Sequence, residues 1–313
     1  MKKISLVPFL LIVPLLSSCG LGMGQAPTFA KEGQEVDYED FNDLLATASS
    51  ESELNMYTVP LQDRDAKLNR YAFSNHSRKR NGKEIFKYEE ISNSKIEYQF
   101  DYDSLVAKET FDYRRTIKNS DSTNLNNAEL SQKGTEYYQF AKISGVFSFV
   151  EISNDNSTYH SIRQSNDKDD VFNVFAIETI DSYLREFYSY KPANVYDADG
   201  YLFYVNDETL FTFETSRDRE EDLRINNVSY GKRVIKNKIK CQLDLTDKKE
   251  ALRLSYEVNT QETYSKDYYS GLNESIFAGD IQTSEERIYI DFSSTTKKID
   301  VNEVDLSSYT LIR

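Results

Sequence analysis

Apolar and polar residues alternate with a period of two through most of the chain. The clearest stretch is 95–103, in which Ile96, Tyr98, Phe100 and Tyr102 alternate with charged and amide side chains. Such alternation predicts a strand with one apolar and one solvated face. Residues 239–245 and 252–258 alternate in the same way around a polar turn, which predicts a β-hairpin. Shorter runs predict further strands at 86–88, 111–113, 138–149, 201–205, 210–215 and 288–292.

Turn residues separate several of these runs. Asn81-Gly82 predicts a tight turn, because both residues accept a left-handed backbone. Asn206-Asp207-Glu208 predicts the turn of a second hairpin. Residues 118–134 are rich in Asn and Ser and predict a polar loop.

Two segments have helical spacing instead. Asp37 is a candidate N-cap for a helix with an apolar stripe at Phe41, Leu44, Leu45 and Ala48. A longer helix is predicted at 169–189, capped by Asp167 and ended by Lys191-Pro192. Its stripe is broad, which indicates burial against a sheet, and comprises Phe172, Phe175, Ile177, Ile180, Leu184 and Phe187.

The element order is helix, meander, helix, meander. Long antiparallel strands without crossover helices favour the α+β class, mainly antiparallel β, with curved sheet packed on two amphipathic helices. The domain prediction is one β-rich unit at 37–313. Two arrangements fit it: two similar halves, 37–165 and 169–313, or one continuous curved sheet with both helices on its concave side.

The first 20 residues have the three parts of an export signal. Lys2 and Lys3 precede an apolar stretch, Leu6–Leu16, which is too short to span a bilayer. The following Leu16-Ser17-Ser18-Cys19-Gly20 resembles the lipobox of bacterial lipoproteins. The alternative is an ordinary signal peptide that contains a cysteine.

The lipobox resemblance implies that residues 1–18 are a signal peptide, that Cys19 receives a diacylglyceryl group, and that a peptidase cuts between Ser18 and Cys19. Two acyl chains hold a protein stably on a membrane. The expected location is therefore the extracytoplasmic face of a cell membrane, with a covalent lipid anchor. Residues 19–36 are small, polar and without periodicity, which predicts a flexible tether.

The charge excludes some partners. Without residues 1–18 the chain has 36 basic and 52 acidic residues, a net charge of −16. This balance argues against nucleic acid and against anionic lipid headgroups as partners. Tyr and Phe number 23 and 18, while Trp is absent, a composition suited to half-buried strands. With Cys19 lipidated, Cys241 has no intramolecular partner for a disulfide.

Residues for catalysis are scarce. The chain has two histidines, His76 and His160, and lacks the nucleophile, metal-helix, phosphate-loop and Cys-x-x-Cys motifs. Asp167–Asp170 and Asp197–Gly200 depart from the EF-hand pattern, so turn and cap roles explain them better than calcium. We predict no enzyme, no catalytic residue, no metal and no cofactor.

The chain ends with Ile288-Tyr289-Ile290-Asp291-Phe292-Ser293 and then Lys298-Ile299-Asp300-Val301. Together with the lipobox, the amphipathic helix and the aromatic strands, this ending is similar to lipoproteins of the LolA and LppX type. The resemblance implies a curved antiparallel sheet around helices, with a cavity for acyl chains. The residues lining it would be Tyr98, Phe100, Phe175, Ile180, Leu184, Leu254 and Tyr256. The simpler interpretation is that these residues pack as a closed core.

Three functional hypotheses remain. The first is a non-enzymatic binding module for a lipid or another apolar ligand. The second is a structural or interaction lipoprotein, without a ligand cavity, whose acidic surface meets a protein partner. The third is a hydrolase built from dispersed carboxylates. An apolar cavity would favour the binding module. A solid core with an exposed aromatic patch would favour the interaction lipoprotein. Carboxylates clustered in a polar cleft would favour the hydrolase.

Overall fold

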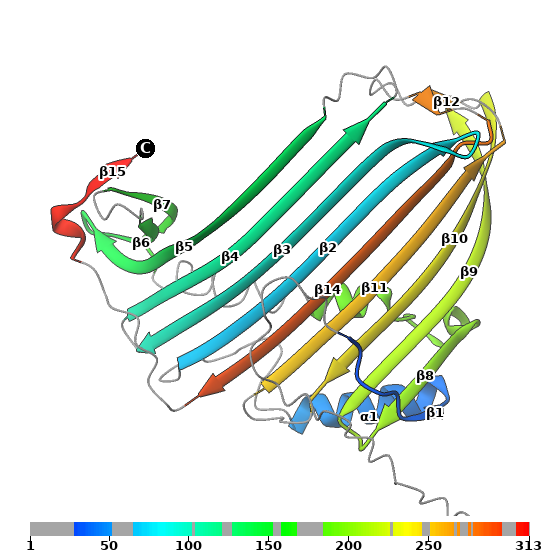
Figure 1. The fold of residues 1–313 in the computed structure, drawn as a ribbon. Coiled ribbons are helices and arrows are strands. Elements are labelled where there is room, and N and C mark those ends of the chain that lie inside the picture. Colours follow the sequence, from blue (N-terminus) through cyan, green and yellow to red (C-terminus); the bar gives the residue numbers. More distant parts are fainter. Residues whose placement is uncertain are drawn as a thin grey trace, which may run out of the picture.

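The computed structural model describes residues 28–51, 65–101, 104–120, 127–152, 158–167, 184–225, 228–245, 251–265, 268–269, 275–276, 278–295 and 305–312. One sheet of 13 strands dominates this part of the chain (Figure 1). Its strands are β1 (Gln34–Val36), β2 (Asp65–Arg80), β3 (Lys83–Asp101), β4 (Ser104–Asn119), β5 (Ala128–Ile143), β6 (Val146–Ile152), β7 (Thr158–Ser165), β8 (Tyr201–Asn206), β9 (Leu210–Ile225), β10 (Val228–Asp244), β11 (Ala251–Tyr264), β14 (Ile281–Thr295) and β15 (Thr310–Ile312). A small separate pair is formed by β12 (Tyr268–Tyr269) and β13 (Ser275–Ile276), and short 3-10 helices by η1 (Val195–Ala198) and η2 (Leu306–Ser308).

The strand order is β1-β8-β9-β10-β11-β14-β2-β3-β4-β5-β6-β7-β15. Neighbours are antiparallel except β15, which runs parallel to β7. β14, near the end of the chain, lies between β11 and β2. The strands of the two predicted halves, 37–165 and 169–313, therefore belong to one continuous sheet.

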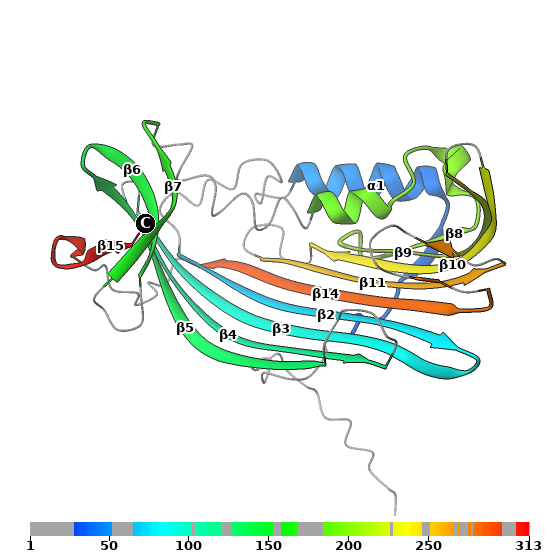
Figure 2. The same cartoon turned by 90° about the horizontal axis from the view of Figure 1, so that it is seen from above.

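Helices pack on the concave side of the sheet. α1 (Tyr38–Glu51) and a helical segment at 184–190 lie together on that side (Figure 2). Phe41 and Phe187 are fully buried against Phe213 of β9, with Leu254 of β11 in the same cluster. Burying a large apolar side chain stabilises a fold by about 1.5–3 kcal/mol, so this layer holds the helices to the sheet.

The predictions of the first helix and of the hairpins are confirmed. The Asp37 carboxylate accepts the backbone N–H of Asp40 at 2.8 Å, as an N-cap does. The predicted stripe of α1 faces the core. Asn81 and Gly82 both have positive φ, 51° and 76°, in the turn between β2 and β3. The 239–245 and 252–258 runs pair as β10 and β11.

Two predicted segments are described only in part. The helix at 169–189 is described from Leu184, and it ends at Tyr190 before Lys191-Pro192, as predicted. The loop prediction for 118–134 is wrong for Ala128–Gly134, which belongs to β5 and pairs with β4. This part of β5 has too few apolar residues for a clear alternation, and β6 pairs with β5 only from Tyr137 onward. Neither helical segment in the described residues is long and apolar enough to span a membrane.

Candidate functional site: a groove beside the N-terminal strap

Residues 28–36, here called the strap, cross the convex face of the sheet. They then turn around its margin, where β1 pairs with β8, and lead into α1 on the concave side (Figure 1). The prediction of a flexible tether at 19–36 is therefore wrong for 28–36. Composition suggested a linker, but this segment is held by contacts to strands far along the chain.

Gln242 of β10 holds the strap through its side-chain amide. The Gln242 Oε1 accepts the backbone N–H of Ala30 at 2.8 Å, and its Nε2 donates to the Ala30 carbonyl at 3.1 Å. The same Nε2 donates to Thr212 Oγ1 at 3.0 Å, and Gln242 is buried. One side chain thus satisfies both backbone polar groups of Ala30.

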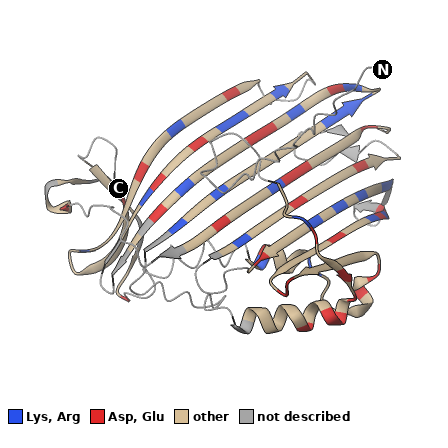
Figure 3. Cartoon of the chain, turned by 60° about the horizontal axis from the view of Figure 1, so that its bottom comes forward, with Lys and Arg blue, Asp and Glu red and all other residues tan. Residues whose placement is uncertain are grey.

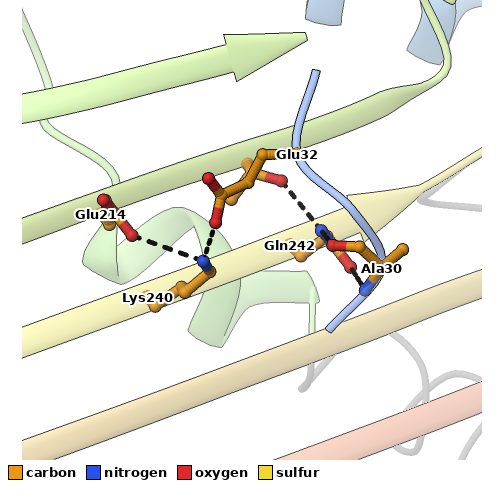
Figure 4. A network of polar contacts seen from close by, with 6 residues as sticks. Ala30, Glu32, Glu214, Lys240 and Gln242 are labelled. Carbon is orange, nitrogen blue, oxygen red and sulfur yellow. Dashed lines mark hydrogen bonds and ion pairs between the residues drawn. The ribbon is translucent and has the colours of Figure 1, made fainter. Parts of the chain in front are cut away.

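An ion-pair network is centred on Lys240, two residues before Gln242 on the same face of β10. Lys240 Nζ contacts the carboxylates of Glu32 in the strap and of Glu214 in β9 (Figure 4). Burial lowers the pKa of Lys240, but the two carboxylates outweigh burial and raise the pKa above its ordinary value. Lys240 therefore stays charged and links the strap to two strands. Its Nζ also lies 5.4 Å from the centroid of the Phe29 ring.

Gly33 allows the strap to approach β8 closely. A Cβ added at Gly33 would lie 2.0 Å from the carbonyl oxygen of Val205, which is backbone and has little freedom to move. Only a residue without a side chain fits this passage.

Two hollows flank Phe29 on the convex face. The larger, about 510 Å³, lies over β8–β11 and has apolar walls formed by Phe29 and Leu202. Charged side chains of both signs complete its lining: Glu214, Lys238, Lys240 and Glu257. The smaller, about 220 Å³, lies toward β14 and β2, between Phe29 and the tyrosines Tyr71 and Tyr289. We call the larger hollow the strap groove.

The rest of the convex face is strongly polar. Lys, Arg, Asp and Glu are spread along the strands (Figure 3). On the convex face Lys236 of β10 pairs with Asp218 of β9. Leu202, 44% exposed, interrupts this pattern at the strap groove. The other two exposed large apolar side chains of the described residues are Val195 (48%) and Tyr196 (90%), in η1 just before β8. All three fall within eight residues, so the exposed apolar surface is concentrated at this end of the sheet.

The predicted cavity residues are placed as follows. Leu184, Leu254 and Tyr256 are buried in one cluster with Phe41 and Phe187, so they belong to a closed core. The backbones of Tyr98 and Phe100 lie in β3, while Phe175 and Ile180 are outside the described residues. Ser18 and Cys19 are outside them too.

The strap residues were not predicted as a site. Phe29, Gly33 and Gln242 carry no motif, and the contacts join segments more than 170 residues apart. The one local signal is Gln242, an uncharged amide that follows Lys236, Lys238 and Lys240 on the same face of β10.

A second polar cluster lies on the concave face. The Tyr138 hydroxyl donates to Glu136 at 2.8 Å and contacts Glu109 at 3.3 Å. Burial, together with the charge of Glu136, raises the pKa of Glu109. The Tyr138 hydroxyl lies within hydrogen-bond distance of both carboxylates. Among the described residues no cluster of His, Cys, Asp and Glu is suited to hold a metal ion.

The remaining sequence candidates have structural roles. Cys241 is fully buried in the core, and burial raises the pKa of its thiol well above the ordinary value. The Asp197–Gly200 segment is a turn: Asn194 caps η1, and Arg217 donates to the Asp197 carbonyl at 2.6 Å. His76 contacts Ser74 at 2.9 Å and the ring of Tyr88. The side chain of His160 is outside the described residues.

No family model and no curated protein matches the chain. Solved structures give weak similarities. A structure described as lipid–protein interactions in lipovitellin is 10% identical over 78% of this chain and 27% of that chain, with a TM-score of 0.25. Pseudomonas aeruginosa OccK7 (OpdD) is 7% identical over 74% of this chain and 98% of that chain, with a TM-score of 0.23. The outer membrane protease OmpT from Escherichia coli is 6% identical over 74% and 96%, with a TM-score of 0.17.

The chain therefore spans about a quarter of the lipovitellin chain. TM-scores this low carry no inference about function, which is argued below from the chain's own residues.

Proposed function

We propose that the protein is an exported lipoprotein, anchored through lipid on Cys19, that binds an amphiphilic lipid-like molecule without chemical conversion. The observation that carries the proposal is the strap groove. Its apolar walls are the half-buried Phe29 and the 44% exposed Leu202, on a surface otherwise rich in charged side chains. Its volume, about 510 Å³, is within the range of small-molecule sites.

The charges of the groove restrict the polar end of such a ligand. Lys238 and Lys240 lie beside Glu214 and Glu257, so neither sign dominates. A strongly anionic or cationic headgroup would meet one pair of like charges, at an electrostatic cost. An uncharged or zwitterionic headgroup fits both pairs.

Native mass spectrometry of residues 25–313 with a zwitterionic lysophospholipid tests the binding. The expected result is a one-to-one complex that Phe29→Ala and Leu202→Ser each weaken by about 10-fold or more, the loss expected for one apolar wall. The matched control is Ile91→Ser, on the convex face at β3, away from the groove. Binding that is equally strong in all four proteins, or absent in the parent, would contradict the proposal.

The anchor is tested separately in cells. With Cys19 intact we expect incorporation of labelled palmitate and recovery of the protein in the membrane fraction. Cys19→Ala should abolish the label and the cleavage after Ser18. A labelled Cys19→Ala protein would show that the lipid is attached elsewhere.

A further inference from the structure

The outer margin of β5 has a stretch to which no strand in the described residues is paired. Ala128–Ile143 pairs with β4 on one side, and on the other side β6 begins to pair only at Tyr137. Alternate residues of 128–136 direct their backbone N–H and C=O groups away from β4, and no strand in the described part of the chain pairs with them. Such a margin is a template for another strand.

The side chains of this stretch suit a second copy of the same strand. Glu129, Ser131 and Lys133 are exposed and share the convex face. When two β5 strands run antiparallel about a two-fold axis at Ser131, Glu129 of each copy lies opposite Lys133 of the other. Lys133 already pairs with Asp112 of its own chain at 2.8 Å, but its side chain is 60% exposed, so its ammonium also faces the neighbouring copy. Opposite charges facing each other across a strand pair are stabilising.

Other registers lose this match. A shift by two residues places Lys133 opposite Ser131 or Asn127, and a further shift sets two Glu129 or two Lys133 side chains against each other. Odd shifts would turn the convex face of one copy to the concave side of the other. One register alone thus pairs both charges.

This register also fits the space at the margin. The ladder covers 128–134 of each copy, with Ala128 opposite Gly134, and stops before the pairing of Tyr137 with Ile152 of β6. On the concave side, the Phe111 ring lies over Gly134, where a Cβ would be 2.9 Å from the ring. Because Gly134 has no side chain, the Phe111 ring lies over the β5 backbone. There it can contact the second copy in addition to the backbone hydrogen bonds.

We propose that the protein self-associates by antiparallel β5–β5 pairing centred on Ser131, so that two sheets join into one. The contact is short, so pairing should be favoured where copies are held close together. The stronger pairing of copies held close together rests on the proposed lipid anchor. The register of the two β5 strands does not depend on the anchor.

Disulfide cross-linking of the full-length chain tests the register, both in isolated membranes and in concentrated purified protein. Directly opposed residues have Cα atoms about 4.5–5.5 Å apart, within the roughly 4.4–6.8 Å that a disulfide spans. Ser131→Cys should therefore form a cross-linked dimer on oxidation. Thr135→Cys is the matched control, since the two copies of this position would lie about 26 Å apart. Cys241 is buried and should not compete. The purified protein carries Cys19→Ala, so that a free thiol at position 19 cannot cross-link.

Charge reversal tests the pairing itself. In the Ser131→Cys background, Glu129→Lys should lower the cross-linked yield roughly tenfold, because like charges then oppose each other at both symmetric positions. Adding Lys133→Gln should recover part of the yield, because the repulsion is removed while Asp112 keeps its ion pair with Arg114. Glu208→Lys, the same change in the exposed β8–β9 turn, should have no effect. Circular dichroism checks that each variant folds.

Equal cross-linking of Ser131→Cys and Thr135→Cys, or no effect of Glu129→Lys, would overturn the proposal. A chain that fails to reach the membrane contradicts the anchor alone, since the experiment with purified protein still tests the register.

Discussion

Gln242 is the residue on which the strap depends most directly. Gln242→Ala removes three hydrogen bonds and leaves Thr212, also buried, without this partner. Losing a buried hydrogen-bond partner costs about 1–3 kcal/mol, so the strap should open about 10- to 100-fold more often. Trypsin cleavage after the exposed Lys31 measures this opening. Gln261→Ala, on the same face of β11, is the control and should leave the cleavage rate unchanged.

Glu109 gives the fold a pH dependence. Its carboxyl titrates near 4.5 when the chain is unfolded and at a higher pH when folded, mainly because it is buried. Between these two values the folded protein binds more protons, so the free energy of unfolding falls as the pH rises through that interval. Glu109→Gln keeps the hydrogen-bonding shape and removes the charge. We expect stabilisation at pH 7, on the order of 1 kcal/mol, and a flatter dependence of the urea midpoint on pH. A parent and variant with parallel pH profiles would contradict this.

At the scale of elements, the strap should separate from the fold without unfolding it. Gly33→Ala places a Cβ against the Val205 backbone, and β1 can then no longer pair with β8. The core lies on the opposite face, so the urea midpoint should change little while cleavage after Lys31 accelerates. Gly145→Ala introduces backbone strain at φ +88° in a distant hairpin, with open space around it. It should lower stability without exposing Lys31.

The elements that the sequence predicted are those whose determinants are local. Asp37, the α1 stripe and Asn81-Gly82 act on neighbours within a few residues, so spacing alone reveals them. The first part of β5 was missed because Gly134 and its polar neighbours gain their meaning from pairing with β4 and from the ring of Phe111.

The site was harder to predict than the fold. The strap has no periodicity, and Gly33, Glu32 and Ala30 are fixed by Val205, Lys240 and Gln242, more than 170 residues away. The predicted cavity residues were chosen for apolar spacing. Spacing identifies a buried face, but a lined cavity and a closed core produce the same pattern. Leu184, Leu254 and Tyr256 are buried in one hydrophobic cluster, so they belong to a closed core and do not line a cavity.

At the scale of the whole molecule, the strap determines how an anchored protein would face its membrane. Thr28 is nine positions after Cys19, and an extended chain spans at most about 3.6 Å per residue. A lipid on Cys19 would therefore hold the convex end of the strap within about 32 Å of the membrane. The strap groove and Leu202 would face the lipid surface, and α1 would lie on the far side of the sheet.

Fluorescence energy transfer to a membrane dye tests this orientation on the full-length anchored chain. Single cysteines at Ser216, on the rim of the groove, and at Thr47, on the exposed side of α1, carry the donor. Cys241 should stay unlabelled, because its thiol is buried and its pKa is raised. We expect stronger transfer from position 216 than from position 47. Gly33→Ala should reduce the difference, because a released strap adds several residues of reach and frees the sheet to rotate. Equal transfer from both positions in the parent would mean that the strap does not orient the sheet.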